Sequence, residues 1–119
     1  MYYDDNSLIV TKTGDGGDTA AETGRFFYWL YVLKEKLNYD LGIMPFSKKA
    51  DFENAVKQLN PEPGVLIRHP KMWNDPADFS RDQTTPMIAS LGAYGVYDVL
   101  VDIVWKRIKR LGFYLNVDF

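Results

Sequence analysis

The chain has no cysteine and only one histidine, His69, among its 119 residues. Without cysteine it can form neither disulfides nor zinc–thiolate sites, and it has no thiol nucleophile. One histidine cannot supply a metal site built from several histidines, so we predict neither a bound metal nor a cofactor. The lack of cysteine is also compatible with a reducing compartment, and we predict a cytoplasmic location.

Long hydrophobic runs and a basic charge excess are also missing. A membrane-spanning helix needs roughly 20 apolar residues, and the apolar stretch 96–105 is too short and is interrupted by Asp98 and Asp102. The first six residues lack the basic and apolar regions of a secretory signal. The net charge is −2, whereas nucleic-acid binding needs a basic surface. We therefore predict neither a membrane nor a nucleic-acid partner.

What the sequence does contain is enough apolar material for one core, with 46% hydrophobic and 15% aromatic residues. Apolar residues recur at helical spacing in four stretches that glycine and proline separate. The predicted helices cover about residues 19–37, 47–60, 80–92 and 96–111. Only residues 8–11 favour a short strand. We predict a single all-α domain over residues 1–119, with about four helices packed as a bundle or a partial α/α-hairpin array.

Two of these helices carry recognisable start signals. Thr19-Ala-Ala-Glu22 fits a capping box, in which the two side chains satisfy free N–H groups of the first turn. The third helix has two candidate starts. Ser80-Arg-Asp-Gln83 also fits a capping box, and Thr85 followed by Pro86 fits an N-cap with proline at the first helical position.

A glycine-rich acidic loop, Gly14-Asp-Gly-Gly-Asp18, precedes the first helix. A helix N-terminus attracts anions, but no Gly-Lys-Ser/Thr follows, and Asp15 and Asp18 would repel phosphate. Two interpretations remain. The loop is either a tight turn whose aspartates cap the helix, or part of a catalytic site that uses Asp15 and Asp18.

A long polar connection between the second and third helices is the other candidate site, since connections of this length are often functional. His69 is the one side chain poised for proton transfer near neutral pH, unless it is a loop histidine bonded to the backbone. Carboxylates can act as general acid and base, and an aromatic ring can stack on a sugar. The candidate catalytic residues of this segment are His69, Asp75 and Asp82, and the candidate substrate-binding residues are Arg68, Trp73 and Arg81. The alternative is that Arg81 and its neighbouring acids form a structural ion-pair network.

Two short motifs carry a family resemblance: Gly-Asp-Gly-Gly-Asp-Thr before an aromatic-rich helix, and Asp-Phe-Ser-Arg-Asp-Gln at the opening of a later one. They resemble bacterial and phage proteins of uncharacterised function and, more distantly, the six-hairpin α/α toroids, which include glycoside hydrolases and polysaccharide lyases. The resemblance implies a polar site at one rim of the helices and carbohydrate chemistry. A toroid has many more helices, so it also implies that the chain is a fragment of a longer α/α protein or that the likeness is local.

Two functional hypotheses therefore stand side by side. In the first, the two polar loops meet and form a site that binds or acts on a carbohydrate or another polyhydroxyl ligand. In the second, the chain is a non-enzymatic structural or interaction protein, of phage origin, that forms homo-oligomers through its apolar helices. Whether the protein is an enzyme is left open between them.

Overall fold

The computed structural model describes residues 2–12, 18–39, 49–71 and 81–110. Within these ranges the fold is mostly helical, which confirms the predicted fold class. The helices are α1 (Thr19–Tyr31), the π-helix η1 (Val32–Lys36) that continues it, α2 (Lys49–Leu59), α3 (Arg81–Ala93) and α4 (Tyr97–Arg110). Two short antiparallel strands, β1 (Tyr2–Tyr3) and β2 (Ile9–Val10), pair with Tyr2 opposite Val10.

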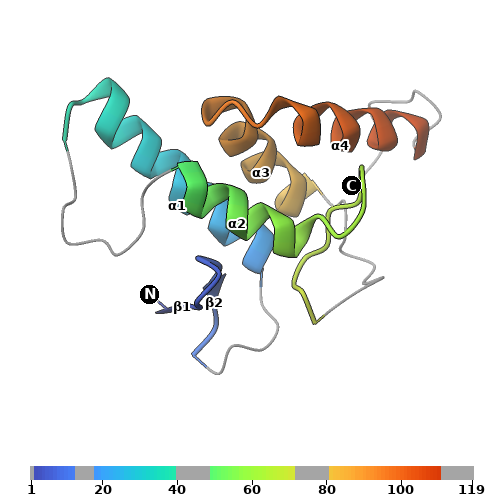
Figure 1. Cartoon of the computed structure of the whole chain (residues 1–119), viewed down its shortest axis with the longest axis horizontal. Coiled ribbons are helices and arrows are strands. Elements are labelled where there is room, and N and C mark those ends of the chain that lie inside the picture. Colours follow the sequence, from blue (N-terminus) through green and yellow to red (C-terminus); the bar gives the residue numbers. More distant parts are fainter. Residues whose placement is uncertain (1, 13–17, 40–48, 72–80, 111–119) are drawn as a thin grey trace.

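The helix pair α1 and α3 forms the centre of the molecule. Figure 1 shows α4 along one side of this pair and the β1–β2 hairpin on the opposite side. The core between them consists of buried apolar side chains from α1, α2, α3, α4 and β2 and from the segments that connect them. Phe27 of α1, Phe52 of α2 and Ile103 of α4 are all fully buried, so each of these three helices turns one face to the same core.

Close approach of α1 to α3 depends on Gly24. A Cβ placed on this residue would lie 2.7 Å from the backbone nitrogen of Met87 and 2.7 Å from the carbonyl carbon of Pro86. The hydroxyl of Ser90, which is buried, donates a hydrogen bond to the carbonyl oxygen of Gly24. The backbones of the two helices therefore touch at this crossing, with no room for a side chain.

The third helix begins at Arg81, which agrees with the earlier of its two predicted starts. Pro86 lies inside the helix rather than at its first position. Because proline has no N–H, the carbonyl of Asp82 receives no hydrogen bond from it. The helix continues through this position because proline in the second turn removes only one bond of the ladder.

Tyr94, just after α3, joins the core to the far end of α1. Its ring stacks on Phe52 at a centroid distance of 5.0 Å and meets Phe27 edge-on at 6.0 Å. Its hydroxyl donates a 2.7 Å hydrogen bond to the carbonyl oxygen of Phe27. Burial, with a smaller contribution from the negative charge of Glu35, raises the pKa of Tyr94 to about 12. The phenol therefore stays protonated and keeps this bond over the whole physiological range.

Among the helices of the described ranges, none is both long and apolar enough to cross a bilayer. The four predicted helices all occur, with ends within a few residues of the predicted ones. The predicted N-cap of α2, Ser47, lies outside the described residues.

Candidate functional site

The residues predicted for a catalytic site fall into two groups. Asp15, Trp73 and Asp75 lie outside the described residues, and only the backbone of Arg81 is described. The remaining four are Asp18, Arg68, His69 and Asp82. Their roles in chemistry stay predictions, but their positions are defined.

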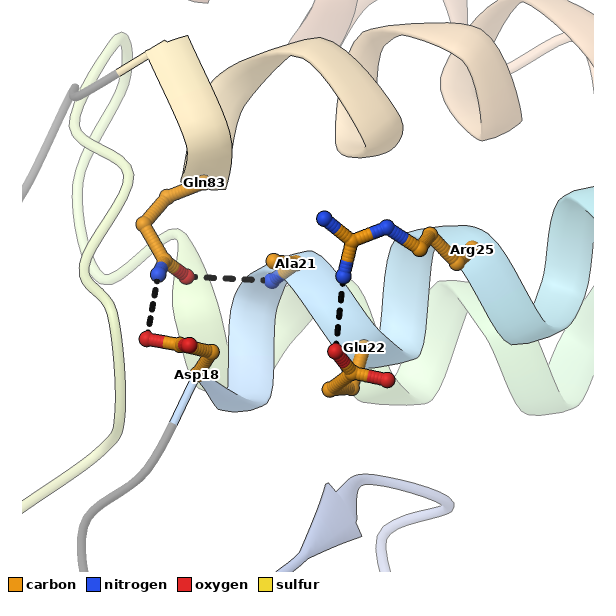
Figure 2. A network of polar contacts seen from close by, with 5 residues as sticks. All are labelled: Asp18, Ala21, Glu22, Arg25 and Gln83. Carbon is orange, nitrogen blue, oxygen red and sulfur yellow. Dashed lines mark hydrogen bonds and ion pairs between the residues drawn. The ribbon is translucent and has the colours of Figure 1, made fainter.

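The start of α3 contacts the start of α1 through Gln83, a buried residue. Figure 2 shows its side-chain amide pointing between Asp18 and Ala21. The amide nitrogen donates to Oδ1 of Asp18 at 2.9 Å, and the backbone N–H of Ala21 donates to Oε1 of Gln83 at 3.0 Å. One side chain from α3 thus bonds both the residue before α1 and the first turn of α1.

Arg68 reaches the same helix end through its backbone. The N–H of Ala20 donates to the carbonyl oxygen of Arg68 at 3.0 Å. The N–H groups of a first helical turn have no partner within their own helix, and here two of them are satisfied by residues far along the chain. The loop that ends at Asp18 and the polar connection after α2 therefore meet at the N-terminus of α1.

The predicted capping box at this position is wrong. Asp18, not Thr19, precedes the first residue of α1, and its side chain makes no cap hydrogen bond. The carboxylate of Glu22 pairs with Arg25 at 2.7 Å on the exposed side of the helix, as Figure 2 shows. Gln83, the glutamine of the second predicted capping box, bonds Asp18 and the first turn of α1 with its side-chain amide.

His69 is only 3% exposed. The backbone N–H of Lys71 donates to its Nδ1 at 3.1 Å. A ring nitrogen that accepts a hydrogen bond carries no proton, which places the proton of the neutral ring on Nε2. This geometry favours the alternative of a buried histidine that holds its own loop in shape.

Asp18 and Asp82 are both exposed at this end of the molecule. Two cavities in the described part of the chain lie away from them: one where the end of η1, the start of α2 and the end of α3 meet, the other along α1 beside Ile9. No three acidic or histidine side chains of the described ranges are grouped as a metal would need. The arrangement of the described polar residues is that of a long-range helix cap.

Sequence reasoning missed two features. The first is Gln83, whose role cannot be seen locally because its partner Ala21 lies 62 positions away. The second is an exposed apolar stripe on α4, formed by Tyr97, Val101 and Trp105, which are 60%, 61% and 53% exposed. The spacing of four residues places these three side chains in one row, and that spacing was visible in the sequence.

The sequence matches no protein-family model, no curated protein and no solved structure. The resemblance to α/α toroids therefore stays a prediction that rests on its two short motifs.

Proposed function

We propose that the protein is a non-enzymatic interaction protein that pairs with a second copy of itself through α4. The observation that carries this proposal is the exposed apolar stripe of Tyr97, Val101 and Trp105. Single exposed apolar residues are common on protein surfaces, but a contiguous row of large ones marks an interaction surface. Aromatic residues are also enriched at the centres of interfaces.

The charges beside the stripe favour a second copy, in antiparallel orientation, as the partner. Asp98 and Asp102 are exposed in the first half of α4, and Lys106 and Lys109 are exposed in the second half. In two antiparallel α4 helices that cross at Val101, Asp98 of each copy, three residues before the axis, would lie about two residues, or about 3 Å along the helix, from Lys106 of the other copy, five residues past the axis. Such opposite charges across an interface fix the orientation of the partners.

The pairing would also match the apolar residues. About a two-fold axis at Val101, Tyr97 of one copy lies opposite Trp105 of the other, and the two valines meet. Large aromatic side chains cover about 150–250 Å² each, so the half-exposed stripe offers roughly 300 Å² per copy. A standard interface takes about 800 Å² per partner. The stripe is smaller than that, so we expect a weak dimer that forms only at high protein concentration.

Sedimentation velocity over a range of protein concentrations tests this proposal. Val101→Asp is expected to abolish the dimer, because it buries two unpaired charges at the axis. Leu37→Asp is the matched control, since Leu37 is equally exposed, at 65%, but lies beyond η1. It is expected to leave the dimer intact.

A charge exchange separates paired helices from unspecific association. Asp98→Lys and Lys106→Asp are each expected to weaken the dimer, and the double variant is expected to restore it. A wild-type protein that stays monomeric up to about 1 mM, or a double variant no better than the single ones, would refute the proposal.

A second candidate function is binding of a carbohydrate at the N-terminus of α1. The specific observation in its favour is that Asp18 lies beside the start of α3, so that one part of each predicted polar loop is brought to the same end. Saturation-transfer NMR with a panel of oligosaccharides tests it. Loss of a signal in Asp18→Asn and Asp82→Asn, with unchanged folding, supports this candidate, and the absence of any signal with the wild type removes it. The lack of cysteine is compatible with the cytoplasmic location that we propose for either function.

A further inference from the structure

The cavity at the other end of α1 has a different character from the cap at its start. It has a volume of about 300 Å³ and lies where the end of η1, the start of α2 and the end of α3 meet. Its lining residues are Leu30, Tyr31, Lys34, Glu35, Lys49, Ala93 and Tyr94. Ligand sites are typically of about this size, about 300 Å³ and upward, with an apolar lining and a few polar groups.

The floor of the cavity is apolar and aromatic. Leu30 and Ala93 contribute aliphatic surface, and the rings of Tyr31 and Tyr94 meet at an angle of 61° with centroids 5.9 Å apart. The hydroxyl of Tyr94 donates its hydrogen bond to the carbonyl oxygen of Phe27, so Tyr94 offers the cavity its ring rather than a free donor. Such a floor suits a flat apolar body, because rings set at an angle favour edge-to-face contacts.

Three charged side chains line the cavity, those of Lys34, Glu35 and Lys49. Lys34, Glu35 and Lys49 make no hydrogen bond or ion pair within the described part of the chain. Two ammonium groups and one carboxylate give the lining a net charge of 2 − 1 = +1, in a protein whose net charge is −2. The cavity is thus a local positive site on an acidic protein.

Lys49 is also placed where an anion would stabilise it. It is the first residue of α2, and a positive side chain at the positive end of a helix dipole is unfavourable. Its ammonium nitrogen would lie 3.8 Å from a Cβ on Gly95, so the side chain extends from the start of α2 toward the turn after α3. An anion in the cavity beside Lys49 would interact favourably with both this ammonium group and the dipole of α2.

We propose that this cavity binds a small monocarboxylate with an aromatic or other apolar body, whose carboxylate lies between Lys34 and Lys49. Glu35 limits the charge that the site accepts, because a second negative charge on the ligand would be repelled by its carboxylate. The π-helix that supplies Lys34 and Glu35 is consistent with this role, since π-helical turns occur frequently at functional sites. No residue of α4 lines the cavity, so the inference is independent of the proposed dimer.

Titration of the protein with benzoate, followed by NMR of the tyrosine rings, tests the inference. Benzoate is expected to shift the ring signals of Tyr31 and Tyr94 saturably, with a dissociation constant of about 1 mM for a ligand of this size. Benzamide, which has the same shape without the charge, is expected to bind roughly tenfold more weakly. Equal shifts by benzoate and benzamide, or no saturable shift by benzoate, would overturn the inference.

Variants locate the charge that is responsible. Lys34→Gln and Lys49→Gln are each expected to weaken benzoate binding about five- to tenfold, whereas Lys57→Gln, on the exposed side of α2, leaves it unchanged. Glu35→Gln is expected to strengthen it. Unchanged circular dichroism and melting temperature show that each variant is folded. Displacement of benzoate by an equal concentration of inorganic phosphate would contradict the preference for a monocarboxylate, and a wild-type affinity in Lys49→Gln would contradict the site itself.

Discussion

Replacing Gly24 by alanine tests whether the crossing of α1 and α3 is the rigid centre of the fold. The new Cβ would lie 2.7 Å from two backbone atoms of α3 and 2.8 Å from a third, the carbonyl oxygen of Pro86. Ordinary contacts of a Cβ begin near 3.4 Å, so the helices must separate by about 3.4 − 2.7 = 0.7 Å. Backbone atoms of a helix cannot rotate out of the way as a side chain can.

The magnitude follows from two opposing contributions. Alanine is favoured over glycine inside a helix by about 1 kcal/mol. Overpacking costs about 1–3 kcal/mol, and we expect the upper end here. A gap of 0.5–1 Å forfeits about a quarter to a half of the dispersion energy of neighbouring contacts, and the hydrogen bond from Ser90 to Gly24 is stretched. The net effect of Gly24→Ala is a loss of about 2 kcal/mol in the free energy of unfolding, or about 8 °C in melting temperature.

Gly92→Ala is the matched control, because Gly92 lies in α3 and a Cβ placed there meets nothing within 4 Å. It gains the helix propensity without the collision, so we expect a stabilisation of about 0.5–1 kcal/mol. Urea unfolding, followed by circular dichroism, measures both variants. If Gly24→Ala proves as stable as Gly92→Ala, the close contact between α1 and α3 is not as described and the reasoning fails.

Three further predictions concern single side chains. Gln83→Leu should lower the free energy of unfolding by about 2–3 kcal/mol, because the substitution leaves the buried N–H of Ala21 without an acceptor. Urea unfolding measures this loss, and a loss below about 0.5 kcal/mol would contradict the long-range cap. Tyr94→Phe should cost about 1 kcal/mol at neutral pH through the lost bond to Phe27. Folding raises the pKa of Tyr94 from 10.0 to about 12, so the stability that the protonated phenol contributes is fully present below pH 10 and is lost as the pH rises toward 12. The difference in free energy of unfolding between wild type and Tyr94→Phe should therefore shrink over that interval, and unfolding curves recorded by circular dichroism measure it. Asn38 has a φ of 52°, a left-handed conformation that glycine adopts easily and alanine does not. Asn38→Ala should therefore destabilise the protein by about 1 kcal/mol and Asn38→Gly should not, and equal melting temperatures of the two variants would contradict this.

The helices were predictable because their signals are local. Phe52, Ala55, Val56 and Leu59 repeat at helical spacing in the sequence, and all four are buried on one face of α2. The start of α3 was ambiguous because two local rules conflicted there. The acidic and glutamine-containing first turn favoured a start near Ser80, and Pro86 favoured a later one. The earlier start holds because a proline within the second turn interrupts the hydrogen-bond ladder only once.

The surface of α4 was harder to predict, because its apolar face is wide. The spacing of its apolar residues does not tell which part of this face packs against a neighbouring helix. In the structure α4 packs on α3 at one edge of the molecule, so Ile103 is buried while Val101 and Trp105 are exposed. The number of neighbours of a helix is a property of the whole fold, which is why the sequence of α4 shows the spacing of these residues but not that they are exposed.

The two ends of α1 also differ in whether their polar groups are already bonded. At the first end Asp18 binds Gln83, and Arg68 and Gln83 accept hydrogen bonds from the first turn. Lys34 lies sixteen residues further along, or about 24 Å away at 1.5 Å per residue. There the charged side chains make no hydrogen bond or ion pair within the described residues. The carboxylate of Asp18, a residue predicted for a catalytic site, thus takes part in holding the fold. The lysines around the cavity, which no sequence motif marks, make no such bonds within the described residues and keep their charge for a ligand.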